Sequence, residues 1–330
     1  MQAHYESCEE AQIEAKIARI ESNTYYAVPL KEPSRIVRST LRGKFKKDFR
    51  LKKDKLYTTD ICVVGDQVEV LMNEDGTGVI HSISPRKNHL SRKAPKIKGA
   101  SYRGERLEQV IAANLDALYV VMSFQRPEFN NKILDRFLVV GESAQIEVAI
   151  IMNKFDLVTE EDEDWIDFYE DLGYSVFCTC AKTGAGVNAL KESFRGKTSL
   201  MWGQSGVGKS SLLNNMFPGL LLSTNDISEW SNRGKHTTVS VQMFDIDENS
   251  FIVDTPGVRE IDPYGIRKED LSHYFVEFVD YINDCKYSGC THNHEPGCAI
   301  VEAVENGEIS EFRYDSYLRM LDTTEDDMFF

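Results

Sequence analysis

The residues with the clearest chemical meaning form the segment Gly203-Gln204-Ser205-Gly206-Val207-Gly208-Lys209-Ser210. It fits the pattern G-x-x-x-x-G-K-[ST], with an apolar strand expected before it at Thr198–Trp202 and a helix after it at Ser211–Met216. In such a segment, glycines let backbone N–H groups and the helix N-terminus surround a phosphate. Lys209 would reach the β- and γ-phosphates, and Ser210 would ligate Mg²⁺. The sequence therefore predicts a nucleoside triphosphate site, with Ser211 opening its helix.

A second motif, Asn153-Lys154-Phe155-Asp156, follows the apolar run Glu147–Met152, which is typical of a buried parallel strand. Ligands of open α/β sheets bind at the carboxyl ends of strands, so this position suits a base-binding loop. A carboxylate at Asp156 can accept hydrogens from guanine N1 and from its exocyclic amine, whereas adenine offers no such pair. We therefore predict GTP rather than ATP, with Lys154 along the base and Asn153 joining this loop to the phosphate loop.

A third element, Cys180-Ala181-Lys182, ends a further expected strand at Ser175–Cys178. It resembles the Ser-Ala-Lys element of GTP-binding proteins, in which a backbone N–H meets the guanine carbonyl oxygen. Cysteine stands here in place of the serine. The sequence thus assigns this turn, together with Asp156, to the base.

The segment Asp254-Thr255-Pro256-Gly257 follows the expected strand Phe251–Val253 and fits the pattern D-x-x-G. Asp254 would hold Mg²⁺ through water, and the backbone N–H of Gly257 would contact the γ-phosphate. A polar loop before this strand ends in Thr237 and Thr238, one of which would ligate Mg²⁺. We favour Thr238, with Thr237 as the alternative.

The position after D-x-x-G, which holds a water-orienting glutamine in Ras-like enzymes, is Val258. Valine neither donates nor accepts a hydrogen bond, so slow intrinsic turnover is expected. His236, beside the candidate threonines, is our first choice for the catalytic group that positions the water, since its pKa class lies near neutrality. The alternative is a loop histidine that is exposed to solvent or packed on a partner. If His236 positions the water, the variant His236→Ala should keep its affinity for GTP and lose the GTP turnover that a binding partner stimulates.

Four possible metal ligands, Cys285, Cys290, His292 and Cys298, form the pattern C-x4-C-x-H-x5-C within fourteen residues. Three thiolates and one imidazole suit tetrahedral Zn²⁺, and four protein ligands would leave no open position, which is typical of a structural site. His294 is an alternative fourth ligand. Unligated cysteines in a polar loop are the alternative to a metal site.

The elements that must position these residues fall into three stretches. Before residue 105, short β-like runs separated by turn signals predict a small β-barrel, with an OB-fold favoured over an SH3-like barrel. From Leu115, longer apolar strands alternate with helical patterns, including a helix at Lys132–Ser143, which is typical of an α/β fold. After about residue 265 the chain is helical and acidic. The strands expected in the barrel are Tyr25–Val28, Arg35–Val37, Asp66–Leu71 and Gly78–Ile83.

We therefore predict a multidomain protein with three domains. Residues 1–106 would form an all-β OB-fold RNA-binding domain with an acidic N-terminal extension and a basic linker at 86–106. Residues 107–264 would form the GTPase domain, and residues 265–330 a mainly helical zinc-binding domain with an acidic tail.

Composition limits the classes of protein that fit. The chain has 330 residues, of which 42% are hydrophobic and 28% charged, which excludes a disordered or fibrous protein. Because no apolar run reaches the roughly 18–20 residues of a membrane-spanning helix, we expect a cytoplasmic protein with no membrane partner. Seven cysteines at irregular spacings favour free thiols and a metal over a disulfide framework. A monomer is the default expectation.

The net charge of −15 is unevenly distributed. Residues 31–55 carry a net +8 and residues 86–106 a net +7, which leaves −30 for the rest of the chain. Such polarity suits a protein in which one end binds a phosphate backbone, although two solvated basic loops are the alternative. Aromatic residues of the barrel could stack on RNA bases or form barrel core: Tyr25, Tyr26, Phe45 and Phe49.

The order of the motifs differs from that of most GTPases, because the base-reading elements at 153 and 180 precede the phosphate elements at 203 and 254. This is a circular permutation of the same sheet. The order, the barrel before it, the segment Arg233–Thr238 with Asp254–Glu260, and the Cys/His cluster resemble the ribosome small-subunit-dependent GTPase family RsgA, also called YjeQ. Ala113–Asp116, at the junction with the barrel, is a further point of likeness.

The resemblance implies an OB-fold, a permuted GTPase domain and a zinc-binding domain, and it favours His292 over His294 as zinc ligand. It also implies a role in late assembly of the small ribosomal subunit, with binding to its rRNA and with hydrolysis of GTP to GDP and phosphate stimulated by that subunit. The rival hypothesis is a GTP-gated binding module in signalling or metal delivery that does not involve RNA. ATP hydrolysis is a more distant alternative.

Overall fold

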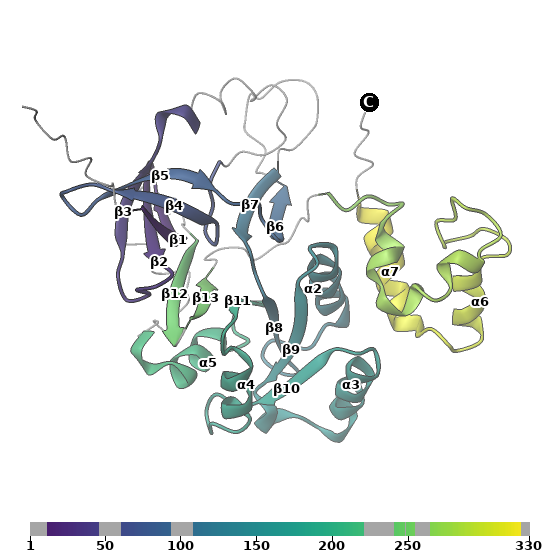
Figure 1. Cartoon of the computed structure of the whole chain (residues 1–330). Helices are drawn as coiled ribbons and strands as arrows, with labels where there is room; N and C mark the ends of the chain where they lie inside the picture. Colours follow the sequence, from purple (N-terminus) through teal and green to yellow (C-terminus); the bar gives the residue numbers. More distant parts are fainter. Residues whose placement is uncertain are drawn as a thin grey trace, which may run out of the picture.

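The computed structural model describes residues 12–45, 61–93, 108–220, 241–247, 249–254 and 265–324. In chain order these residues form a β-barrel, a layered α/β unit and a helical unit, which lie side by side in Figure 1. The basic segments 31–55 and 86–106 lie partly outside this set. The polar loop that ends in Thr237 and Thr238, Phe49 and the acidic residues 325–327 lie wholly outside it.

The first five strands close into a barrel. Each strand pairs with the next in the order β1-β2-β3-β5-β4, and β4 returns to β1; the β3–β5 pairing is parallel and the others are antiparallel. Inward and outward residues alternate along β3, where Val37, Ser39 and Leu41 are buried and Arg38 and Thr40 are exposed. The strands are β1 (Gln12–Glu21), β2 (Thr24–Pro29), β3 (Val37–Leu41), β4 (Gln67–Met72) and β5 (Gly78–Ile83).

The barrel differs from the sequence expectation in two places. Residues 12–21, which we expected within an acidic extension, form β1, the strand that pairs with both β2 and β4. Five of its ten residues are apolar, and Ala15 and Ile17 are fully buried, but a β-bulge between Ile17 and Arg19 interrupts the alternation of apolar and charged positions, so the strand does not stand out in the sequence. The strand expected at Arg35–Val37 begins only at Val37, because Arg35 and Ile36 are exposed in the preceding loop.

A two-stranded hairpin follows the barrel and replaces part of the expected linker. The strand β6 (His89–Lys93) pairs antiparallel with β7 (Glu108–Ala113). The expectation of a linker throughout 86–106 is therefore wrong for His89–Lys93. Polar and basic side chains on β6 hid the strand, although Leu90 is 1% exposed.

The α/β unit is built on a sheet whose parallel strands have the order β10-β9-β8-β11-β13. The strand β12 runs antiparallel to β13 and also pairs with β1 of the barrel through Arg19 and Gln242, so the barrel continues the sheet. The strands are β8 (Ala117–Ser123), β9 (Glu147–Asn153), β10 (Ser175–Thr179), β11 (Thr198–Trp202), β12 (Gln242–Asp247) and β13 (Ser250–Asp254).

Helices cover both faces of this sheet, which gives three layers (Figure 1). Apolar side chains of α2 and α3 pack on one face, and those of α4 and α5 on the other. The expected helix at Lys132–Ser143 is confirmed with one additional residue. The helical elements are α2 (Asn131–Ser143), η2 (Phe155–Leu157), α3 (Glu160–Asp171), α4 (Val187–Ser193), α5 (Lys209–Met216) and η3 (Pro218–Leu220).

The C-terminal unit consists of short helical turns and two α-helices around a core that includes Phe275, Phe278 and Tyr317. Val139 of α2 belongs to the same core, so the unit packs on the α/β layer. Its elements are η5 (Leu271–Tyr274), η6 (Val276–Phe278), η7 (Ile282–Asp284), α6 (Ala299–Glu305) and α7 (Glu311–Thr323).

A buried ion network joins this unit to α2. The Arg313 guanidinium on α7, with 0% of its side chain exposed, donates to Asp135 Oδ1 at 2.6 Å and to Glu277 Oε1 at 2.6 Å. Asp135 also accepts hydrogen bonds from the hydroxyls of Tyr169 and Ser316. These carboxylates raise the pKa of Arg313 and outweigh the opposite effect of burial. A charge this deeply buried is tolerated only when it is paired, so the C-terminal unit must pack on α2 in the arrangement that pairs Arg313 with Asp135.

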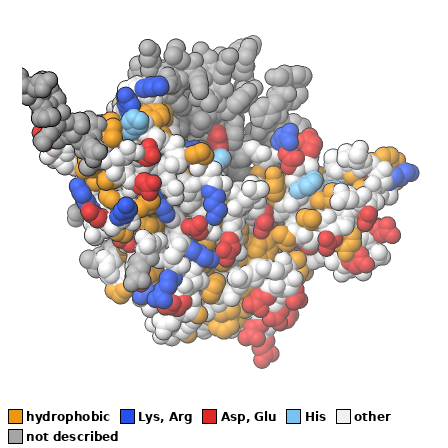
Figure 2. Space-filling model, in the orientation of Figure 1, with side chains coloured by type: hydrophobic (Ala, Val, Ile, Leu, Met, Phe, Trp, Pro, Cys, Tyr) orange, Lys and Arg blue, Asp and Glu red, His pale blue; other side chains and the backbone are white. Residues whose placement is uncertain are grey.

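Acidic side chains gather over α3 on the face shown in Figure 2. Lys and Arg are more frequent over the barrel in the same view, in agreement with the uneven charge of the sequence. No helix among the described residues has the length and apolar character needed to cross a bilayer.

Candidate nucleotide-binding site and metal centre

The phosphate loop leaves the sheet at the end of β11, all five residues of which are buried. The loop turns at Gly208, which has φ +98° and directly precedes α5. Lys209, the first residue of α5, donates from Nζ to the carbonyl oxygens of Gly203 (2.7 Å) and Gln204 (2.8 Å). These hydrogen bonds place the ammonium within the loop, where a bound phosphate would lie.

Two glycines of the loop are required by close contacts. A Cβ on Gly203 would collide with the carbonyl oxygen of Val121, on the neighbouring strand β8. A Cβ on Gly208 would collide with the side-chain amide of Asn153, which reaches the loop from the end of β9. Glycine is therefore needed at Gly208 for its positive φ and also for the approach of the base-reading loop.

Asn153 connects three segments that lie far apart in the sequence. Its Nδ2 donates to the carbonyl oxygen of Val207 at 2.7 Å, which is the link to the phosphate loop that the sequence predicts. Its Oδ1 accepts from the backbone N–H of Ala181 at 3.2 Å and from Thr179 Oγ1 at 3.3 Å. Because Asn153 is 1% exposed, each amide group needs these partners, and the three segments are held in one arrangement.

Asp156 lies beside the Cys180-Ala181-Lys182 turn. The Cys180 thiol donates to Asp156 Oδ1 at 3.1 Å, and Cys180 itself is 2% exposed. The ammonium of Lys154 contacts the carbonyl oxygen of Arg126, and burial together with the Arg126 guanidinium lowers the pKa of Lys154. Lys182 is exposed. Cys180 therefore occupies the position at which a serine is expected, and it offers the Asp156 carboxylate a thiol, which is a weaker donor than a hydroxyl.

The carboxyl ends of the parallel strands bring the predicted elements to one edge of the sheet. Ser123, Asn153 and Thr179 lie opposite one another in register at the ends of β8, β9 and β10. The strands β11 and β13 end at the same edge, in the phosphate loop and in Asp254. The residues that remain, Ser205, Gly206, Ser210 and Ser211, lie in the loop and at the start of α5.

Four predicted residues lie outside the described part of the chain, namely His236, Thr237, Thr238 and Gly257. Two supporting residues escaped the sequence reasoning. Thr179 donates to Asn153, and Asn215 on α5 donates from Nδ2 to the carbonyl oxygen of Ala181 at 3.0 Å. The available signals were a polar residue at the end of an expected strand for Thr179 and a polar residue on the helix after the phosphate loop for Asn215. The partners of both residues depend on how these elements pack.

The four predicted metal ligands are brought together in the C-terminal unit. One ligand atom from each of Cys285, Cys290, His292 and Cys298 lies within 4.8 Å of every other. His292 Nδ1 is 3.4 Å from the sulfurs of Cys285 and Cys298, and those sulfurs are 3.9 Å apart. Zn–S bonds of about 2.3 Å at tetrahedral angles would place two sulfurs about 3.8 Å apart, so the donor set and its spacing fit zinc.

His292, and not His294, lies in the cluster with the three cysteines. His292 is 3% exposed and points into the cluster, whereas His294 is exposed. Two tyrosine hydroxyls of α7 hold the loop 285–298, called the ligand loop below. Tyr314 donates to the carbonyl oxygen of His292 at 2.8 Å, and Tyr317 donates to that of Thr291 at 2.7 Å. The metal loop and α7 therefore form one packed unit.

Comparison with known proteins agrees with this arrangement. Residues 83–264 match the family model described as RsgA GTPase. The chain is 40% identical over 287 residues to the small ribosomal subunit biogenesis GTPase RsgA 2 of Bacteroides thetaiotaomicron, covering 86% of this chain and 90% of that protein. It is 41% identical over 284 residues to the small ribosomal subunit biogenesis GTPase RsgA of Thermotoga maritima, covering 85% of this chain and 86% of that protein.

Two solved structures are similar over almost the entire chain. The crystal structure of YjeQ from Thermotoga maritima has a TM-score of 0.74 and 36% identity, and covers 94% of this chain and 98% of its own. The structure of YloQ, described as a circularly permuted GTPase, has a TM-score of 0.70 and 29% identity and covers 100% of both chains. Because the family model spans more than half of the chain and relatives about 40% identical cover most of it, the chain belongs to the RsgA GTPase family.

Proposed function

We propose that this protein is a GTP phosphohydrolase that binds the small ribosomal subunit and assists its late maturation. The observation that carries the proposal is the contact of Asn153 with Val207, which joins the base-reading loop to the phosphate loop. Relatives about 40% identical to this chain are named small ribosomal subunit biogenesis GTPases. The barrel and the basic segments 31–55 and 86–106 of the sequence, which precede most of the GTPase unit, support rRNA as the partner.

In the proposed complex, Asp156 accepts hydrogens from guanine N1 and the exocyclic amine. The backbone N–H of Lys182 meets the guanine oxygen, since that of Ala181 already donates to Asn153 Oδ1. Lys209 exchanges its carbonyl partners for the β- and γ-phosphates, and the amides of Gly206 and Gly208 face the same oxygens. The distinction from ATP arises because adenine would leave the Asp156 carboxylate without its donors.

Magnesium would be held by Ser210 and by Thr238, with Asp254 acting through water, and would neutralise charge on the phosphates. Hydrolysis requires a group other than Val258 to orient the water. His236 is the proposed catalytic positioning group, and the Gly257 N–H is proposed to contact the γ-phosphate.

We further propose the division into an OB-fold RNA-binding domain (1–106), a permuted GTPase domain (107–264) and a zinc-binding domain (265–330). Support comes from separate apolar cores in the barrel and in the C-terminal unit. The strand order β1-β2-β3-β5-β4 with return to β1 supports the OB-fold over the SH3-like alternative. The zinc would be structural, because four protein ligands leave no open coordination position.

The test of this function is GTP turnover with and without purified small ribosomal subunits. We expect slow turnover alone and a large stimulation by small subunits, with large subunits as the matched control. Equal turnover in all three reactions would contradict the proposal and favour a GTP-gated binding module that does not act through RNA.

A further inference from the structure

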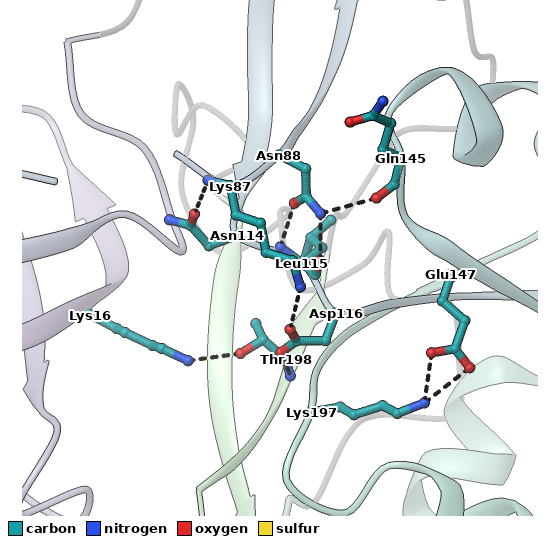
Figure 3. Close-up of polar contacts among 10 residues, drawn as sticks. All are labelled: Lys16, Lys87, Asn88, Asn114, Leu115, Asp116, Gln145, Glu147, Lys197 and Thr198. Carbon is teal, nitrogen blue, oxygen red and sulfur yellow. Dashed lines mark hydrogen bonds and ion pairs between the residues drawn. The ribbon is translucent and has the colours of Figure 1, made fainter. Parts of the chain in front are cut away.

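A polar cluster lies at the edge of the sheet opposite the nucleotide site, where the barrel meets the α/β unit (Figure 3). Asp116, just before β8, accepts from the backbone N–H of Thr198 at 2.9 Å. Lys16 of the barrel donates from Nζ to Thr198 Oγ1 at 2.9 Å. Thr198 is the first residue of β11, so residues from two units meet at the start of the strand that leads to the phosphate loop.

The charged side chain of Lys16 reaches Thr198 past the apolar ring of Phe251. Its ammonium lies 4.9 Å from the centre of the Phe251 ring, on β13, and both Thr198 (1% exposed) and Phe251 (3% exposed) are buried. Burial lowers the pKa of Lys16, and the Asp116 carboxylate opposes that effect. An ammonium in such surroundings needs its few partners, so the contact fixes where the barrel sits.

The two strands that Lys16 contacts are those that end in the phosphate site. The strand β11 runs from Thr198 to Trp202, directly before Gly203, and β13 runs from Ser250 to Asp254. At about 3.3 Å per residue, the five buried residues of β11 span about 16 Å between the barrel and the phosphate loop. A short, buried strand paired on both sides moves as a unit, so a shift at Thr198 reaches the loop.

A second contact between the barrel and this sheet leads to the same site. Arg19, on the same strand as Lys16, pairs with Gln242 at the start of β12. The strand β12 pairs along its length with β13. The barrel therefore contacts β11 and β13 through the side chain of Lys16, and it is also connected to β13 through its pairing with β12.

We propose that Lys16 is a positioning residue that couples the barrel to β11, which leads into Gly203, and to β13, which ends in Asp254, so that RNA bound on the barrel alters the phosphate site. This inference rests on the proposed function, because it takes rRNA as the ligand of the barrel. The nucleotide state should in turn alter the barrel, since coupling between two sites is reciprocal.

The experiment compares Lys16→Met and Thr198→Val with the control Lys197→Met. The first removes the ammonium and keeps the methylenes near Phe251, and the second removes its acceptor from the other unit. Lys197 lies next to Thr198 but pairs with exposed Glu147 at 3.1 Å, so the control removes an ammonium at the same edge without touching the barrel. Lys16→Arg tests rescue by the retained charge.

Three quantities are measured for each protein: affinity for a fluorescent GDP analogue, basal GTP turnover, and turnover with small ribosomal subunits. Lys16→Met and Thr198→Val should keep affinity and basal turnover within about twofold and lose about fivefold or more of the stimulation. Lys197→Met should match the wild type, and Lys16→Arg should retain part of the stimulation. Full stimulation in Lys16→Met would overturn the proposal.

Hydrogen exchange separates this inference from the proposed function. Amides of β1 should exchange differently with GDP and with a non-hydrolysable GTP analogue in the wild type, and equally in Lys16→Met. If small subunits do not stimulate the wild type, the proposed function fails and this exchange difference alone decides the coupling. If Lys16→Met loses GDP affinity or unfolds, Thr198→Val decides, and normal coupling in that variant overturns the proposal.

Discussion

At the scale of single residues, the proposed base site contains one unusual donor, the thiol of Cys180. Cys180 supplies a thiol to Asp156 at 3.1 Å, whereas a serine hydroxyl is expected at that position. A thiol is a weaker donor than a hydroxyl, so the carboxylate is oriented less firmly. The effect of this donor on GTP binding is open to direct measurement.

Cys180→Ala should lower GDP affinity by about 2- to 10-fold, because Asp156 loses a hydrogen-bond donor worth about 0.5–1.5 kcal/mol. Cys180→Ser should restore the affinity or exceed that of the wild type. Titration of a fluorescent GDP analogue measures both. Cys178→Ala is the matched control, and an equal loss in that variant would indicate a general packing effect.

Asp156→Asn should weaken GTP binding by about 100-fold or more, because the amide presents a donor to the hydrogens of guanine. Xanthosine triphosphate, which offers an acceptor at that edge, should bind the variant better than GTP. Competition between the two nucleotides measures the preference. An unchanged preference for GTP would remove Asp156 from the base site.

At the scale of elements, helix α7 joins the metal loop to the α/β unit. Its tyrosines hold the ligand loop, and its Arg313 lies in the buried network with Asp135 of α2. The same helix thus connects two sites that the sequence treats as unrelated. Each connection leads to a separate prediction.

Arg313→Met should reduce the free energy of unfolding by about 3–5 kcal/mol, because it leaves Asp135 and Glu277 buried without their cation. The neighbouring pair of Lys132 with Asp315 is partly exposed at both ends, so Asp315→Asn should cost only about 0–1 kcal/mol. Urea unfolding followed by tryptophan fluorescence compares the two. Equal losses would show that the buried network does not stabilise this joint.

His292→Ala should abolish stoichiometric zinc, because His292 Nδ1 faces two of the sulfurs and the remaining three ligands leave the site open. His294→Ala should retain one zinc per chain, since that side chain is exposed. Metal analysis of the purified proteins gives the result. Loss of zinc in the His294 variant alone would reverse the assignment.

At the scale of the whole molecule, charge is distributed unevenly along the chain. The segments 31–55 and 86–106 are strongly basic, while the remaining chain carries −30. Attraction to a phosphate backbone releases counterions and is therefore sensitive to salt.

Binding to small ribosomal subunits should weaken by about 10-fold or more between 50 and 200 mM salt if several phosphates are contacted. The double variant Arg38→Glu, Arg42→Glu changes an exposed residue of β3 and an exposed residue just after it, and it should bind more weakly and show a smaller salt dependence. Lys191→Glu on α4 is the control for a change of charge elsewhere. Sedimentation with small subunits across a salt series measures all three, and identical slopes would place the RNA contact away from β3.

The sequence alone determined the chemistry and the order of the sites. The glycines, Lys209, Asp156 and the Cys/His cluster are readable because local spacing dictates backbone conformation and ligand type. The strands β8, β9 and β11 were readable because both of their faces are buried, so their sequences are continuously apolar.

Only the tertiary structure decided which distant groups meet. In β1 a β-bulge interrupts the alternation of apolar and charged residues, and the role of the strand appears only when it pairs with β2, β4 and β12. The contacts of Lys16 with Thr198 and of Arg313 with Asp135 join residues 182 and 178 positions apart. A charged residue in a sequence is normally solvent-exposed, and its burial follows from the packing of whole units rather than from local pattern.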